Sequence, residues 1–157
     1  MITELLRATP HIKLTIITSV IDDTIVEVGD FIAPYDGLID ISLYEDGEIS
    51  HKTINKISHI KSYSHPPFGV ARDYAAAIVI DVLGIHQDRQ KFLDSVYKIL
   101  LNGCEIIIMQ KQGSIDIEST LELLDSCEFR AVNYIADLVD GYDVVVGKKL
   151  HMWGKGL

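Results

Sequence analysis

The strongest constraint on the fold is a pair of short apolar runs in the second half of the sequence, separated by one amphipathic segment. Residues 75–82 are rich in Ile and Val, and residues 106–109 form the core of a second run of strand length. Uninterrupted runs of this kind are typical of strands buried on both faces. Residues 87–101 carry apolar side chains on one helical face, and Asn102 and Gly103 end that pattern. The order predicts two parallel strands joined by a helical crossover.

The end of the sequence adds a helix and a hairpin. Asp116 is a suitable N-cap for a helix with an apolar stripe that runs from Ile117 to Leu124. Residues 131–138 and 142–146 read as strands joined by a turn short enough for antiparallel pairing. Together with the preceding crossover, this pattern predicts an α/β sheet that ends in a hairpin.

The first half of the sequence is less regular. We predict helical turns within residues 3–9, a short helix within residues 50–57 and a loop at 63–72, where prolines and a glycine interrupt the pattern. Strand-like runs are predicted at residues 14–20, 24–28, 38–43 and 60–63. No internal repeat or linker-like composition is visible, so we expect one domain that spans residues 1–157.

Two long stretches of the second half carry a family resemblance. Residues 74–111 read YAAAIVIDVLGIHQDRQKFLDSVYKILLNGCEIIIMQK, and residues 117–154 read IESTLELLDSCEFRAVNYIADLVDGYDVVVGKKLHMWG. They resemble the C-terminal half of class I S-adenosylmethionine-dependent methyltransferases. The resemblance implies a three-layer α/β fold of the Rossmann-like methyltransferase type: a mostly parallel sheet, a C-terminal antiparallel hairpin and an abbreviated N-terminal half.

The resemblance also implies a glycine-rich turn after the first strand, where backbone amides approach S-adenosylmethionine. No Gly-x-Gly is present; the nearest text is VEVGDF, in which Gly29 would be the remnant of the turn if residues 24–28 form the first strand. A second alignment makes residues 14–20 the first strand and residues 21–36 a rebuilt loop. In both alignments GLIDIS resembles the second strand, and its Asp40 would accept hydrogen bonds from the ribose hydroxyls.

Four further residues are candidates on the substrate and adenine sides of such a site. Asp81, Gly84 and His86 lie at or beyond the end of the strand predicted at residues 75–82, which resembles the family's fourth strand, and open α/β sheets bind ligands at such strand ends. His86 would be a general base or a substrate contact; the alternative is that it simply begins the next helix. Phe68, in SHPPFG, would stack on the adenine or plug the edge of the sheet.

Histidines and cysteines are residue types that can bind a metal ion, and the sequence contains both. His51, His59 and His65 fall within fifteen residues, but their spacing matches no zinc finger or HExxH motif, so no metal site is predicted. Cys104 and Cys127 lie in apolar segments with no secretory signal upstream, so we expect reduced thiols in a cytoplasmic protein.

Charge and hydropathy limit the classes of partner. A formal net charge of -9 argues against binding along a nucleic acid, and no apolar run approaches the roughly 20 residues that a membrane helix requires. An abbreviated N-terminal half would leave part of the sheet uncovered, which predicts a homodimer.

The missing glycine turn decides between the functional hypotheses. We expect a methyltransferase-like protein that has lost the usual cofactor pocket and serves as a binding or assembly protein. One alternative is an active S-adenosylmethionine-dependent methyltransferase on an unknown substrate, and another is a domain that binds a small molecule or a metal.

Overall fold

The computed structural model describes residues 1–61 and 73–150. Its strands are β1 (Lys13–Thr18), β2 (Leu38–Leu43), β3 (Ile54–His59), β4 (Tyr74–Ile80), β5 (Leu100–Lys111), β6 (Phe129–Ile135) and β7 (Tyr142–Lys149). Its α-helices are α1 (Asp23–Ile32), α2 (Arg89–Ile99) and α3 (Ile117–Ser126), and the short 3₁₀ helices are η1 (Ile2–Leu5), η2 (Ala33–Tyr35) and η3 (Leu83–Ile85).

All the strands of the described residues belong to one 7-stranded sheet with the order β3-β2-β1-β4-β5-β7-β6. The pairs from β3 to β5 are parallel, whereas β7 is antiparallel to both β5 and β6. The predicted mostly parallel sheet with a C-terminal antiparallel hairpin is therefore confirmed.

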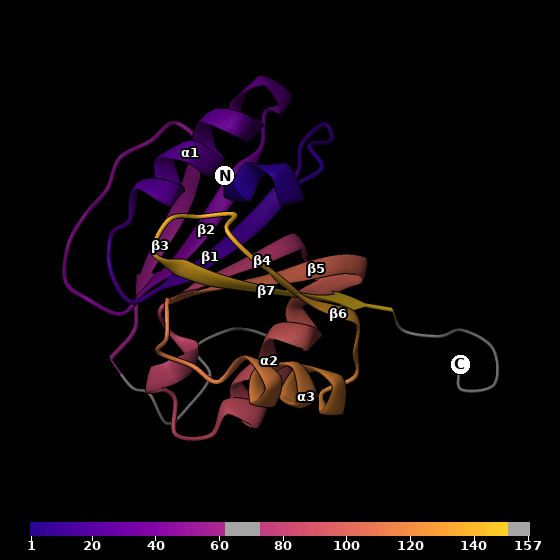
Figure 1. The fold of residues 1–157 in the computed structure, drawn as a ribbon. Coiled ribbons are helices and arrows are strands. Elements are labelled where there is room, and N and C mark those ends of the chain that lie inside the picture. The colour runs from indigo at the N-terminus through magenta and orange to yellow at the C-terminus, as the bar shows by residue number, and fades with distance from the viewer. Residues whose placement is uncertain (62–72, 151–157) are drawn as a thin grey trace.

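Helices cover both faces of this sheet, which gives the predicted three layers (Figure 1). α1 and η1 pack on one face, where Ile16, Ile41 and Ile78 belong to a fully buried cluster. α2 and α3 pack on the other face, where Phe92 and Phe129 are the largest buried side chains. No helix connects β2 to β3 in residues 44–53, so this connection adds no helix to pack against the sheet near β3.

Helix α1 corrects both alignments of the first half. The predicted strand at residues 24–28 is wrong, and residues 21–36 are not a rebuilt loop, although residues 14–20 do contain the first strand. Asp22 caps α1 by accepting a hydrogen bond from the Thr24 amide, and the buried face of the helix includes Ile25 and Ile32. The helical spacing of buried positions outweighs the strand preference of the β-branched residues in this segment.

Smaller differences concern element boundaries. Residues 50–57 do not form a helix, because β3 begins within them. Of the strand predicted at 60–63, Ile60 and Lys61 are not in a strand, and residues 62–63 lie outside the described residues. The helix predicted at 87–101 is shorter, because β5 already begins at Leu100. The Asp116 cap is confirmed, since its side chain accepts a hydrogen bond from the Ser119 amide.

Both cysteines are free thiols, with Cys127 buried and Cys104 partly buried. Burial raises the pKa of Cys127 to about 11, which keeps this thiol protonated and unreactive near neutrality. Within residues 1–61 and 73–150, no helix is long and apolar enough to cross a membrane.

Candidate functional site

The carboxyl ends of the parallel strands meet at one edge of the sheet, which we call the carboxyl edge. Thr18 at the end of β1 is in register with Leu43 of β2 and Ile80 of β4, and Ile80 is in register with Met109 of β5. The loops that follow these residues are therefore neighbours. Open α/β sheets bind their ligands at this edge, so it is the candidate site.

The loop between β1 and α1 is the part of this edge that would face a nucleotide-like cofactor. Its three leading amides already donate hydrogen bonds within the protein. The Ser19 amide donates to Ile80 O over 3.1 Å, and the Val20 amide to Thr18 Oγ1 over 3.3 Å. The Ile21 amide donates to Glu45 Oε1 over 2.9 Å. Each of these amides therefore already has an acceptor within the chain.

Side chains also occupy the space around this loop. Ile21 lies against the loop that follows β2, because a Cβ atom at Gly47 would be only 3.0 Å from Ile21 Cδ1. Glu45, two residues beyond the end of β2, is an acidic residue at this edge, and one of its oxygens accepts a hydrogen bond from the Ile21 amide. Sequence reasoning missed Glu45, because the motif GLIDIS drew attention to Asp40, five residues earlier.

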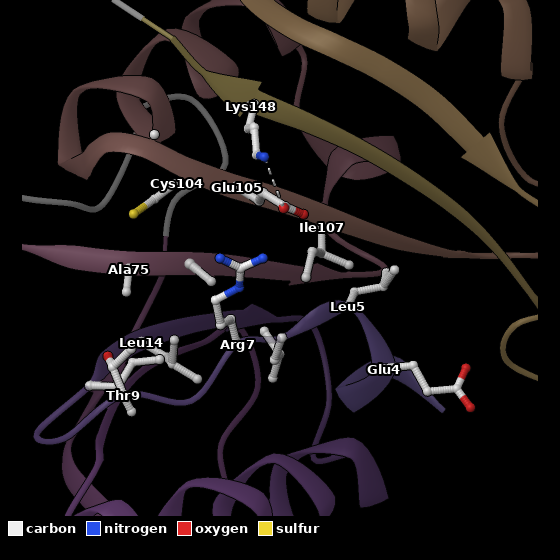
Figure 2. Close-up of a pocket in the computed structure, with 14 residues that line it drawn as sticks. Glu4, Leu5, Arg7, Thr9, Leu14, Ala75, Cys104, Glu105, Ile107 and Lys148 are labelled. Carbon is white, nitrogen blue, oxygen red and sulfur yellow. Dashed lines mark ion pairs between the residues drawn. The ribbon is translucent and has the colours of Figure 1, made fainter.

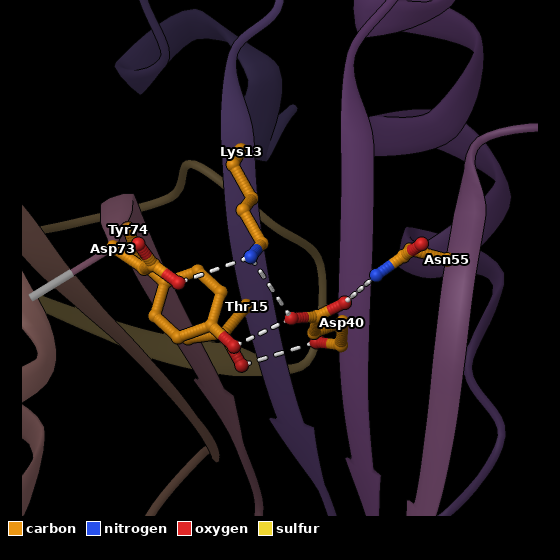
Figure 3. A network of polar contacts seen from close by, with 6 residues as sticks. All are labelled: Lys13, Thr15, Asp40, Asn55, Asp73 and Tyr74. Carbon is orange, nitrogen blue, oxygen red and sulfur yellow. Dashed lines mark hydrogen bonds and ion pairs between the residues drawn. The ribbon is translucent and has the colours of Figure 1, made fainter. Parts of the chain in front are cut away.

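Asp40 lies in the interior of β2, three residues before its end, and not at the carboxyl edge. Its carboxylate is buried and accepts hydrogen bonds from Asn55 Nδ2 at 2.9 Å and from the Tyr74 hydroxyl at 2.6 Å (Figure 3). The structure therefore does not bring Asp40 together with the β1–α1 loop. It joins β2 to β3 and β4, and its role in ribose binding has no geometric support.

A partly exposed lysine, Lys13, links Asp40 to the exposed Asp73, as Figure 3 shows. Lys13 Nζ lies 3.1 Å from Asp73 Oδ2 and 3.7 Å from Asp40 Oδ2. The hydrogen bond to Asp73 raises the pKa of Lys13. Burial, together with the hydrogen bond to Asp40, raises the pKa of the Tyr74 hydroxyl well above its usual value. Both shifts hold these groups in the protonated forms that donate to the carboxylates.

Gly29 lies in the interior of α1 and not in the turn after β1. A Cβ atom there would be 2.7 Å from His51 Cε1 and 2.9 Å from Thr53 Oγ1. His51 Nε2 pairs with Asp30 Oδ1 at 2.8 Å, and His51 Nδ1 pairs with Thr53 Oγ1 at 2.7 Å. Gly29 is thus a packing residue that lets His51 approach the helix, and the structure does not place it where a cofactor carboxylate would bind.

Asp81, Gly84 and His86 all lie beyond the end of β4, where the sequence placed them. Asp81 follows the last residue of β4 and adopts a left-handed backbone with φ 53°; its Oδ1 accepts from the Lys111 amide at 2.8 Å. Gly84 lies in η3, where a Cβ atom would be 3.0 Å from Gln110 Nε2. His86 is buried, and its Nε2 lies 2.7 Å from the Tyr44 hydroxyl.

Burial makes His86 a poor candidate for proton transfer with an external substrate. It is 5% exposed and its ring lies 4.4 Å from that of Phe92. The helix that follows, α2, begins at Arg89 with Asp88 as its N-cap, so His86 itself lies before the helix and ends η3. The role of His86 as a general base stays a prediction, and Phe68 lies outside the described residues.

A tyrosine between two carboxylates completes the carboxyl edge. The Tyr142 hydroxyl at the start of β7 donates to Asp22 Oδ2 over 3.1 Å. Burial, with the charges of Asp22 and Asp81, raises the pKa of Tyr142 to about 12. This contact joins the N-cap of α1 to β7 and so fixes the β1–α1 loop from a second side. Sequence reasoning had no signal for it, since the two contacting residues are 120 positions apart.

The two described histidines of the group at residues 51–65 have separate partners. His51 contacts Asp30 and Thr53, whereas His59 Nδ1 lies 3.1 Å from Glu45 O. In the part of the chain that the structure describes, no three His, Cys, Asp or Glu side chains gather in a way that could hold a metal ion. His65 is outside that part.

A pocket of about 410 Å³ lies away from the carboxyl edge. Leu14 and Ala75, at the amino ends of β1 and β4, form part of its wall, and Arg7 reaches across it toward β5 (Figure 2). On its far side Glu105 and Lys148 form an ion pair of 4.0 Å. The pocket is therefore at the opposite end of the strands from the place where this sheet would bind a nucleotide.

Comparisons with known proteins give a structural likeness but no sequence match. No family model matches the sequence, and no curated protein matches it. Among solved structures, the CurJ carbon methyltransferase superposes with a TM-score of 0.73 at 12% identity, over 95% of this chain and 51% of that chain. A SAM-dependent methyltransferase from Aquifex aeolicus gives a TM-score of 0.71 at 8% identity, over 90% and 84% of the two chains.

A third example carries the cofactor. Phosphoethanolamine N-methyltransferase 2 from Haemonchus contortus, in complex with S-adenosyl-L-methionine, has a TM-score of 0.68 at 7% identity, over 96% of this chain and 51% of that chain. The chain thus spans about half the length of the first and third of these proteins. With the strand order and the terminal hairpin, these likenesses show that the chain has the fold of class I S-adenosylmethionine-dependent methyltransferases.

Proposed function

We propose that this chain is a methyltransferase-fold protein that functions as a binding or assembly protein. In this proposal the β1–α1 loop, which we call the cofactor cradle, is closed to S-adenosylmethionine. The observation that carries the proposal is the state of the β1–α1 loop. The amides of Ser19, Val20 and Ile21 are all bonded within the chain. S-adenosylmethionine would have to break these hydrogen bonds to reach the amides, and each broken bond costs about 1 kcal/mol or more.

The side chains of the loop support the same conclusion. A cofactor that lies along the backbone needs glycine, because any Cβ atom would hold its carboxypropyl group away. Here Val20 and Ile21 stand in that loop, and Ile21 bridges to Gly47 beyond β2. Glu45, an acidic residue just beyond β2, already accepts a hydrogen bond from the loop itself. The residues present therefore do not fit the cofactor of the fold.

Calorimetric and thermal-shift titrations with S-adenosylmethionine and S-adenosylhomocysteine test this proposal. We expect no saturable heat and no shift of the melting temperature at about 1 mM ligand. A ligand at 100 times its dissociation constant would stabilise the protein by about 2.7 kcal/mol and raise its melting temperature by roughly 5–10 °C. The Aquifex aeolicus methyltransferase serves as the positive control. Saturable micromolar binding would instead support an active methyltransferase.

A second copy of this chain is the partner that the sequence predicts. The connection between β2 and β3 in residues 44–53 contains no helix, so the sheet face beside it has fewer helices packed on it, and a second copy could cover that face. Sedimentation velocity over a wide range of protein concentrations measures this directly. A mass of about 17.5 kDa at every concentration would contradict the homodimer.

A further inference from the structure

The charge of the chain is unevenly distributed, and β3 lies in a basic stretch of it. The protein has 23 acidic residues and a net charge of -9, yet residues 49–61 contain no Asp or Glu. The same stretch contains three lysines and two histidines, which are Lys52, Lys56, Lys61, His51 and His59. A basic segment in an acidic protein attracts acidic partners locally, although the whole molecule does not.

β3 is an edge strand, and one side of its backbone has no partner among the described residues. The strand pairs with β2 alone. The Ile60 amide donates to Leu43 O, so by alternation the backbone groups of Ser58 face β2 and those of Ile57 and His59 face away. The outer side of β3 therefore offers alternating donors and acceptors, in the arrangement that an added strand uses.

Two of the lysines lie in or beside β3: Lys56 is within the strand, and Lys52 is two residues before its start. Lys52 and Lys56 are exposed, and no ion pair between described residues involves either of them. Lys61, by contrast, is paired with Asp46 at 2.6 Å. The loop between β2 and β3, residues 44–53, forms no helix, so no helix from this loop packs beside the edge of β3.

We propose that the outer edge of β3 binds an extended acidic segment of a partner protein, which joins the sheet as a further strand. This inference rests on the proposed function as a binding or assembly protein and names the class of partner. Main-chain hydrogen bonds to Ile57 and His59 supply the affinity, and Lys52 and Lys56 select for acidic side chains.

The charge pattern argues against two other occupants. A second copy paired through β3 about a two-fold axis would place two basic segments side by side, and like charges opposed across strands are destabilising. A nucleic acid needs several phosphate contacts to overcome repulsion, and the net charge of -9 is repulsive. An acidic peptide strand meets both the backbone groups and the lysines.

Fluorescence anisotropy with synthetic peptides tests the proposal. The probe is a labelled peptide of about eight residues that alternates Glu and Val. One control peptide has Lys in place of Glu, and another has Pro at alternate Val positions, which removes backbone donors without changing charge. We expect saturable binding of the Glu–Val peptide that weakens with added salt, and binding at least about tenfold weaker for both control peptides.

Matched variants locate the site. Lys52→Glu combined with Lys56→Glu is expected to weaken binding of the Glu–Val peptide at least about tenfold. Lys91→Glu combined with Lys98→Glu changes the charge equally on the exposed face of α2 and should leave binding unchanged. Circular dichroism melts check that both variants remain folded.

Several outcomes would overturn the proposal. The proline peptide could bind as tightly as the Glu–Val peptide, the α2 variant could weaken binding as much as the β3 variant, or the Glu–Val peptide could fail to bind. Tighter binding of single-stranded polyuridine than of the peptide, lost in the β3 variant, would assign the edge to nucleic acid. A homodimer that the β3 variant dissociates would assign it to a second copy. Titration of the same preparation with S-adenosylmethionine judges the proposed function separately.

Discussion

Replacement of Gly29 by alanine distinguishes a packing glycine from an ordinary helical one. An alanine Cβ would lie 2.7 Å from Cε1 and 2.8 Å from Nδ1 of His51, closer than real Cβ contacts allow. His51 lies between the Asp30 carboxylate and Thr53, so it cannot move without loss of a hydrogen bond. Thr53 is buried, with 3% of its surface exposed, and its hydroxyl would lose its partner.

The sign of the effect follows from comparison of three magnitudes. Overpacking of this kind costs about 1–3 kcal/mol, and loss of the hydrogen bond between His51 and Thr53 costs about 1 kcal/mol. The better helix propensity of alanine offsets about 1 kcal/mol of this. We therefore expect Gly29→Ala to lower the free energy of unfolding by about 1–3 kcal/mol. The melting temperature should fall by roughly 2–10 °C.

Urea denaturation followed by circular dichroism measures this change. His51→Ala in the Gly29→Ala background should recover part of the loss, because the double variant removes the group that the new methyl contacts. Val26→Ala, at a position of α1 that is 41% exposed, controls for helix propensity alone. If Gly29→Ala instead stabilises the protein by about 1 kcal/mol, as at an open helical site, the close packing of His51 on α1 is refuted.

Three further perturbations test the network and the loop. Asp40→Ala should lower the free energy of unfolding by about 2–4 kcal/mol in urea denaturation, because the Tyr74 hydroxyl loses its acceptor. A change below about 0.5 kcal/mol, the range of ordinary surface substitutions, would contradict this. The pKa of Tyr142 is raised from 10.0 to about 12, so its contribution to stability is complete below pH 10 and is lost as pH rises toward 12. Tyr142→Phe should make the decline between these pH values shallower, and an identical decline would exclude the residue. Glu45→Ala should remove the acceptor of the Ile21 amide and lower the free energy of unfolding by about 0.5–1.5 kcal/mol. The variant should still give no calorimetric response to S-adenosylmethionine. A saturable response would show that Glu45 alone closes the cradle.

The second half of the fold could be predicted because its pattern is regular. The uninterrupted apolar runs of β4 and β5, the capped helix α3 and the closing hairpin each carry a local signal that agrees with the global fold. The first half could not be predicted in the same way. Five of the ten residues of α1, DTIVEVGDFI, are β-branched, and only the spacing of its buried positions distinguishes it from a strand.

The candidate site was predicted less well than the fold. Asp81, Gly84 and His86 were placed correctly beyond β4, because the end of an apolar strand is visible in the sequence. Asp40 was misplaced, since β2 runs three residues past it and no local signal marks where a strand leaves the sheet. The bond from the Ile21 amide to Glu45 joins two loops, and sequence patterns do not report such contacts.

Amide-resolved nuclear magnetic resonance tests the closed cradle most directly. The measurement records the ¹H–¹⁵N signals and hydrogen-exchange rates of Ser19, Val20 and Ile21, with and without about 1 mM S-adenosylhomocysteine. Because these amides are bonded to Ile80, Thr18 and Glu45, they should exchange slowly and keep their chemical shifts when the ligand is added. Fast exchange in the free protein, together with saturable shifts of these three signals, would contradict the account.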